Sequence, residues 1–114
     1  MQSLLFTPLK IGDLEIKNRI VMPPMCMYKA KDENGLPRCF HRLHYAARAL
    51  GGVGLIIVEA TAVEPRGRIT SRDLGLWNDE QLEAHARLVK ECVKYGAAMA
   101  VQLAHAGRKS ECEV

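Results

Sequence analysis

Three apolar runs in this chain are each followed by side chains that can bind a ligand. The run at 19–22 leads into a segment from Pro23 to Tyr28 that contains a thiol and a phenol. The runs that end near Ala60 and Gln102 lead into small or polar residues. A thiol is a weak hydrogen-bond donor, whereas a phenol and an amide can each donate and accept. Binding and orienting a small ligand is the chemistry that these groups offer.

Each of these residues also has a purely structural interpretation. A cysteine near a strand end, such as Cys26, is most often a small buried hydrophobic residue. Gln102 could cap a strand through its amide, and Tyr28 could be an ordinary loop aromatic. The residue types alone leave these alternatives open.

Three strands are predicted to position these side chains. Pro23 and Pro24 end the first strand, at 19–22, because proline lacks an N–H and restricts the preceding residue. The run at 53–61 shows no alternation of apolar and polar residues, which is typical of a strand covered on both faces in a parallel sheet. The run at 97–105 predicts a third buried strand.

Two helices are predicted between the strands. The first spans about 40–50, where Gly51 and Gly52 stop it, and His44 is expected on its inner face as a hydrogen-bonded core residue. Its apolar face is predicted to be Phe40, Leu43, Ala46, Ala47 and Leu50. The second begins after Asn78 in a capping-box pattern and ends before Gly96. Its apolar face is predicted to be Leu82, Ala86, Val89 and Val93.

Two further segments complete the predicted α/β organisation. Residues 1–18 contain the short alternating segments LKI and LEI around Gly12 and Asp13, which predicts a hairpin. Residues 19–114 then form the order β-α-β-α-β. The connection at 62–77 is longer than a compact unit needs, and such loops are usually functional or disordered.

The carboxyl ends of the three strands are predicted to share one rim. Right-handed crossovers make the strands parallel, and ligands bind at the carboxyl ends of parallel strands. The rim then holds the segments 24–28, 59–61 and 102–105. His105 and Arg108 could approach it. The loop arginines are expected to form a solvated face rather than a phosphate site; they are Arg66, Arg68 and Arg72.

At these residues the sequence resembles the N-terminal part of the old yellow enzyme family. The matching segments are LFTPLKIGDLEIKNRIVMPPMCMY, HYAARALGGVGLIIVEATAVEPRGRI, DLGLWNDEQ and VQLAHAGRK. The resemblance implies the N-terminal portion of a (β/α)8 TIM barrel with FMN at its carboxyl rim. It also implies that the flavin is contacted by Pro23, Pro24, Met25, Cys26, Ala60 and Gln102, and that Tyr28 faces the substrate. Relatives often have Ser where this chain has Pro23.

The resemblance further implies an enzyme that passes hydride from NADPH or NADH through FMN to an alkene conjugated to a carbonyl, an enone or enal. A complete barrel needs about 250 residues, so a chain of 114 residues is expected to be a fragment that binds FMN weakly and lacks catalytic residues of its own. The full-length protein is expected to form a homo-oligomer.

Two other functions remain open. The chain could be a non-catalytic half-barrel that assembles with a complementary chain, because three strands without closure leave unpaired edges. It could also be an electron-transfer domain of flavodoxin type. That alternative is disfavoured because PPMCMY stands where a phosphate-binding loop would follow the first strand.

Composition excludes several classes. The hydrophobic content of 48% indicates a globular chain, and the net charge of +3 is scattered, which does not suggest nucleic-acid binding. No apolar run approaches the ~20 residues of a membrane span and no signal peptide is evident, so a cytoplasmic protein is expected. The four cysteines are expected to be free thiols. No metal is expected, because Cys39, His41 and His44 form an incomplete ligand set.

Overall fold

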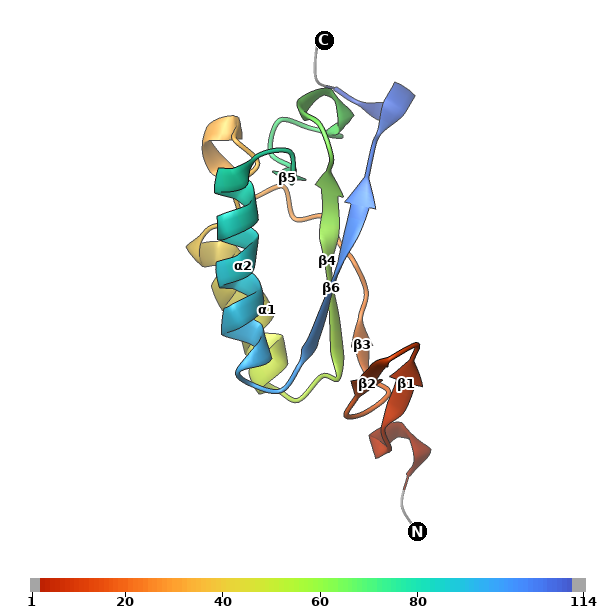
Figure 1. Cartoon of the computed structure of the whole chain (residues 1–114). Coiled ribbons are helices and arrows are strands. Elements are labelled where there is room, and N and C mark those ends of the chain that lie inside the picture. The colour runs from red at the N-terminus through yellow and green to blue at the C-terminus, as the bar shows by residue number, and fades with distance from the viewer. Residues whose placement is uncertain (1–2, 112–114) are drawn as a thin grey trace.

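The computed structural model describes residues 3–111, which form a parallel sheet covered on one face by two helices (Figure 1). The helices are α1 (Cys39–Leu50) and α2 (Asp79–Val93). The sheet contains β3 (Val21–Met22), β4 (Leu55–Ala62), β5 (Leu74–Gly75) and β6 (Ala98–Ala104). The predicted β-α-β-α-β order is therefore confirmed, with one additional strand.

The additional strand is β5, which lies in the connection predicted to be a loop. Its register pairs Leu74 with Thr61 on β4, while β3 pairs with β4 at Leu55. Because β6 occupies the other edge of β4 at both positions, β3 and β5 share one edge. β3 ends at Met22, and β5, which belongs to the connection at 62–77, pairs with the same edge of β4 further along that strand. Two residues are too short for a hydrophobic pattern to reveal this strand.

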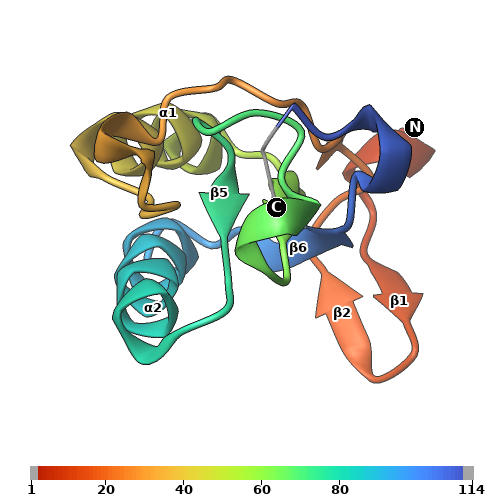
Figure 2. The ribbon, with the colours of Figure 1, turned by 90° about the horizontal axis from the view of Figure 1, so that it is seen from above.

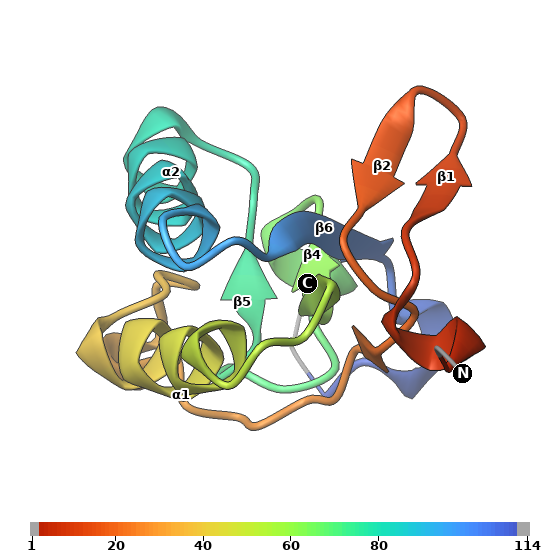
Figure 3. The ribbon, with the colours of Figure 1, turned by 90° about the horizontal axis from the view of Figure 1, so that it is seen from below.

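The two helices lie side by side on the same face of the sheet, as views along the strands show (Figures 2 and 3). Their contact with the sheet forms the hydrophobic core, in which Ile56 and Val58 of β4 meet Tyr45 of α1 and Leu88 of α2. Full burial of a side chain the size of Leu88 contributes about 1.5–3 kcal/mol. This layer fixes α1 and α2 against β4.

The helix faces differ from the prediction. The buried residues of α1 are His41, Tyr45 and Ala49, whereas Leu43 and Leu50 are exposed. On α2 the core-facing set is Gln81, Ala84, His85, Leu88 and Cys92. Leu82, Val89 and Val93 are exposed. The predicted apolar faces were wrong because the core-facing side of each helix includes a buried histidine, while exposed leucines lie on the outer side.

The N-terminal hairpin is confirmed. β1 (Leu9–Ile11) pairs antiparallel with β2 (Leu14–Ile16), and Gly12 takes the positive φ of 59° that the turn requires. The buried side chain of Asn18 joins this hairpin to the sheet. Its Nδ2 donates to the Gly52 oxygen at 2.7 Å, and its Oδ1 accepts from the Ile20 N–H at 3.1 Å. The hairpin lies at the end of the sheet opposite the carboxyl ends of β4 and β6 (Figure 1).

β6 is a strand as predicted, but it is not buried. Val101, Gln102 and Leu103 are all exposed, because among residues 3–111 β6 pairs only with β4. An apolar groove of about 490 Å³ runs beside it, between β6 and the outer side of α2. By contrast β4 is buried along nearly its whole length, as predicted. None of the helices in the described part has the length and apolar character that a bilayer crossing requires.

The open edge of β6 predicts concentration-dependent self-association. Unpaired N–H and C=O groups beside exposed apolar side chains favour pairing with another chain, and a charge on an edge strand opposes it. We therefore expect Val101→Lys to lower the apparent mass of the chain at high concentration, measured by light scattering. Leu43→Lys is the matched control, because Leu43 is 68% exposed on α1, away from the edge. Equal effects of the two substitutions would contradict the prediction.

Candidate functional site

The rim at the carboxyl ends of the strands is shaped by a β-bulge in β4. Val58 pairs with Val101 and Thr61 with Leu103, so the two residues Glu59 and Ala60 lie opposite the single residue Gln102. Bulges re-aim side chains and are over-represented beside active sites. The bulge brings two predicted site residues, Ala60 and Gln102, to the same level of neighbouring strands.

Cys26 lies against this bulge. Burial raises the pKa of the Cys26 thiol, and the carboxyls of Asp73 and Glu59 raise it further. The Ala60 backbone N–H and the Tyr28 hydroxyl face the thiol and act in the opposite direction. The thiol is therefore held largely protonated near neutral pH, as a hydrogen-bond donor rather than a nucleophile.

Tyr28 adopts an unusual backbone conformation. Its φ is +55°, in the left-handed region that residues other than glycine rarely occupy, and its side chain is 41% exposed. The thiol of Cys26 raises the pKa of the Tyr28 hydroxyl. A non-glycine residue held at positive φ costs about 1–3 kcal/mol and is typical of functional sites.

The other predicted flavin contacts lie on the segment that leads from β3 to Cys26. Pro23 and Met25 are exposed and Pro24 is half-buried. The structure thus brings Cys26, Tyr28 and Ala60 into one cluster and places Gln102 beside it. Pro23 and Met25 are left exposed at its edge.

Glu59 is the site residue that the sequence analysis did not single out. Its side chain is only 1% exposed, and the Tyr45 hydroxyl of α1 donates to its Oε2 at 3.3 Å. The Glu59 backbone N–H donates in turn to the same hydroxyl, at 3.0 Å. Burial raises the pKa of this carboxyl to about 7. The Met27 backbone N–H and the Tyr45 hydroxyl act in the opposite direction, because they favour the charged form of the carboxyl. One signal was available: Glu59 is the only charged residue in 53–61.

A pocket of about 430 Å³ opens at the rim beside these residues. Gln102 and His105 line it from β6 and its tip, and Asp73 and Gly67 line it from the connection between β4 and α2. The Gln102 amide has no hydrogen-bond partner among the described residues. Its donor and its acceptor are both available to a ligand.

His105 and the loop arginines have structural partners. His105 Nε2 and Arg66 Nε both contact Oε1 of Glu64, the arginine at 3.0 Å. A Cβ at Gly67 would approach the His105 ring to 2.9 Å, so a larger residue there would require the His105 side chain to shift. Arg68 donates to the Glu33 carbonyl at 2.8 Å and stacks on the Trp77 ring. Arg68 therefore clamps two loops together and is not the solvated residue that was predicted.

The histidines of α1 are placed differently from the prediction. His44 is half-buried and stacks on Phe40, with its carbonyl accepting from Arg48, so it is not a core residue. His41 takes the inner position instead. Its Nδ1 accepts from the Arg38 N–H at 3.0 Å, its Nε2 is buried without a partner, and burial lowers its pKa to about 4.

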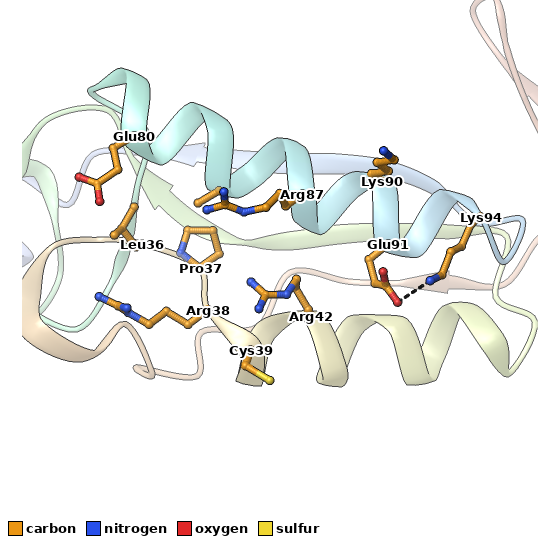
Figure 4. A pocket seen from close by; sticks show the side chains of 11 residues that line it. Leu36, Pro37, Arg38, Cys39, Arg42, Glu80, Arg87, Lys90, Glu91 and Lys94 are labelled. Carbon is orange, nitrogen blue, oxygen red and sulfur yellow. Dashed lines mark ion pairs between the residues drawn. The ribbon is translucent and has the colours of Figure 1, made fainter.

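A hollow larger than the rim pocket lies elsewhere in the fold. It is a groove of about 760 Å³ between α1 and α2 (Figure 4). Five cationic side chains line it, namely Arg38, Arg42, Arg87, Lys90 and Lys94. Two of them are paired: Arg38 with Asp32 at 3.1 Å and Lys94 with Glu91 at 2.9 Å. None of the residues predicted for the ligand site lies in this groove.

Cys26, Cys39 and Cys92 are free thiols in the structure. Cys112, the fourth cysteine, lies outside the described residues. Within 3–111, no three histidine, cysteine or acidic side chains converge as a metal site would require.

Parallel β/α units with helices on one face and a ligand-sized pocket at the carboxyl rim define the chain as part of a (β/α)8 barrel. The sequence model of the NADH:flavin oxidoreductase / NADH oxidase family matches residues 4–114, and the chain belongs to that family.

Individual relatives agree with this assignment. An NADPH dehydrogenase of Bacillus subtilis (strain 168) is 54% identical over 113 residues, which cover 99% of this chain and 33% of that protein. Among solved structures, Old Yellow Enzyme from Pichia sp. AKU4542 superposes with a TM-score of 0.88 at 31% identity, covering 95% of this chain and 28% of that one. Morphinone reductase gives 0.85 at 36% identity, over 93% and 27%. The chain thus spans about a third of the length of its curated relatives.

The raised pKa of Glu59 predicts how stability depends on pH. The folded state binds the Glu59 proton more tightly than the unfolded state, so this contribution is fully present below pH 4.5 and is lost as pH rises through about 7. We expect Glu59→Gln to reduce the fall in unfolding free energy across this window, measured by urea denaturation at several pH values.

Glu83→Gln is the control for this experiment, because it removes an exposed carboxyl on α2, away from the rim. It should leave the slope between about pH 5 and 7 unchanged. An identical pH profile for Glu59→Gln and the wild-type chain would show that Glu59 does not carry the proton.

Proposed function

We propose that this chain forms part of an FMN-dependent oxidoreductase of old yellow enzyme type. In this proposal the whole protein reduces the C=C bond of an enone or enal with hydride from NADPH or NADH. The observation that carries the proposal is the convergence of Cys26, Tyr28, Ala60 and Gln102 at one rim. Family membership and the NADPH dehydrogenase relatives support it. So does morphinone reductase, a structural neighbour solved in complex with tetrahydroNAD.

The residues at the rim fit a flavin. The free amide of Gln102 offers a donor and an acceptor, which suits the alternating pattern of a pyrimidine edge. Ala60 is small, and the protonated thiol of Cys26 is a weak donor that can tune a nearby redox centre. Pro23, Pro24 and Met25 would contribute an apolar wall. When bound, FMN supplies the capacity to accept a hydride from a nicotinamide and to pass it on.

Tyr28 is the residue of this chain proposed to face the substrate. Its ring is partly exposed and its hydroxyl keeps its proton, because the neighbouring thiol raises the pKa of the phenol. A phenol in this state can donate to a substrate carbonyl while its ring packs on the ligand. No group for the proton transfer to the alkene is assigned within this chain.

A second candidate function is assembly with a complementary chain. The exposed edge of β6 and the apolar groove beside α2 favour it, since among the described residues nothing covers either surface. Native mass spectrometry distinguishes the two proposals. A hetero-complex formed with the remaining barrel segments would support assembly, whereas a homo-oligomer of a longer chain would support the enzyme.

The flavin proposal predicts a role for the Gln102 amide that can be measured. We expect FMN to bind the chain weakly and saturably, seen as quenching of flavin fluorescence during titration. Gln102→Ala should weaken binding by roughly tenfold, the value of about 1.4 kcal/mol of lost hydrogen bonding. Glu83→Ala, an exposed substitution on α2, is the control and should leave the affinity unchanged. Equal affinity of Gln102→Ala and the wild-type chain would contradict the proposal.

A further inference from the structure

The segment from Tyr28 to Glu33 has a strained backbone. Three of its residues, none of them glycine, have a positive φ, with values of 55° at Tyr28, 63° at Asp32 and 57° at Glu33. Such conformations persist only where the surrounding structure holds them. The ion pair of Asp32 with Arg38, at 3.1 Å, is exposed and contributes little. The segment that carries Tyr28 therefore depends on other contacts.

Those contacts come from the connection at 62–77. Near the start of the segment the Ala30 N–H donates to the Arg72 carbonyl at 3.1 Å. At its end, Nη1 of Arg68 donates to the Glu33 carbonyl at 2.8 Å. A hydrogen bond from a charged donor is stronger than one between neutral groups, so the contact made by Arg68 is the stronger of the two. The segment is thus bonded to the connection near both of its ends.

The side chain of Arg68 is itself held in one orientation. Its Nε donates to the Pro65 carbonyl at 2.9 Å, and its Nη1 also donates to the Ser71 carbonyl at 3.2 Å. The guanidinium lies over the Trp77 ring, 5.3 Å from the ring centre. A planar guanidinium can make these contacts together, whereas the ammonium group of a lysine is a compact point charge. The position of the donor that reaches Glu33 is therefore well defined.

The loop that contains Arg68 is attached to the sheet through Asp73. This side chain is only 4% exposed. Its Oδ2 accepts from the Ile69 N–H at 2.6 Å, and its Oδ1 accepts from the Thr70 hydroxyl at 3.2 Å. Asp73 directly precedes β5, which pairs with β4. The contacts from this loop to the strained segment therefore start from a fixed part of the fold.

We propose that Arg68 is a positioning residue of the rim: by holding the Glu33 carbonyl, it fixes the segment that presents Tyr28 to a ligand. Without Arg68, two hydrogen bonds remain between the segment and the connection in the described part of the chain. They come from the Ala30 N–H and the Ser71 hydroxyl, each at 3.1 Å. The consequence for a substrate rests on the proposed function, because Tyr28 would face it. The position of Tyr28 without flavin is a property of this chain alone.

The test is the fluorine NMR spectrum of the flavin-free chain in which every tyrosine is replaced by fluorotyrosine. The chain has three tyrosines. Tyr28 reports the segment, Tyr45 is 1% exposed on α1 and reports the core, and Tyr95 reports the region after α2. Tyr28→Phe identifies the Tyr28 resonance. Because the experiment contains no flavin, failure of this inference is distinguishable from failure of the flavin proposal.

We expect Arg68→Ala to move the Tyr28 resonance toward its position in the urea-unfolded chain. The resonances of Tyr45 and Tyr95 should stay in place, because the core does not depend on this contact. Arg72→Ala is the matched control: it removes an exposed guanidinium from the same loop and leaves the Arg72 carbonyl that bonds the segment. An unchanged Tyr28 resonance in Arg68→Ala would overturn the proposal. So would an equal displacement of Tyr45, which a general loss of folded structure produces.

Digestion with a low concentration of trypsin gives a second measurement, on a milder variant. Lys29 and Lys31 are exposed in the segment, and cleavage there follows the fraction of molecules in which the segment is open. Arg68→Lys keeps the charge and loses the planar set of donors, so we expect it to raise the cleavage rate at these sites about tenfold relative to Lys90 in α2. A ratio equal to that of the wild-type chain would overturn the proposal.

Discussion

The burial of β4 between two paired edges and a layer of helices is the constraint on which the rest of the structure depends. Every other strand of the parallel sheet pairs with β4, and both helices pack on its Ile56 and Val58 side chains. Parallel strands leave their carboxyl ends at one edge of the sheet, so the position of β4 decides where the side chains beyond Met22 and Val101 can meet. The rim is therefore a consequence of how one strand is covered.

The order of elements and the parallel sheet could be predicted from the sequence because they rest on strong, local signals. Paired prolines, glycine stops and an uninterrupted apolar run each have one preferred conformation. β5 could not be predicted, because its two residues, Leu74 and Gly75, become a strand only where the edge of β4 is free. The site was predicted in outline because the ends of strands can be located from sequence patterns. The side-chain contacts between elements that are distant in sequence cannot be located in this way.

The helix faces show where hydrophobic periodicity fails. His41 and His85 are buried because their ring nitrogens satisfy a backbone N–H and a carbonyl, respectively, which no apolar residue could do. Leu43 and Leu82 are exposed on the outer sides of their helices. A helix in a (β/α)8 barrel also contacts its neighbouring helices, so its apolar residues need not all face its own strands. Glu59 illustrates the converse, a charged residue whose partner, Tyr45, is distant in sequence.

The bulge in β4 also bears on how this rim can be altered. In a regular strand, successive positions alternate strictly between the two faces, so each residue serves one layer. The extra residue at Glu59 and Ala60 relaxes that alternation, so that one position contacts α1 while the backbone of the next meets Cys26. Deleting a single residue here would restore the alternation and invert the facing of everything that follows in β4. The ligand preference of this rim is thus open to change by substitution, whereas a change of strand length would disrupt both layers together.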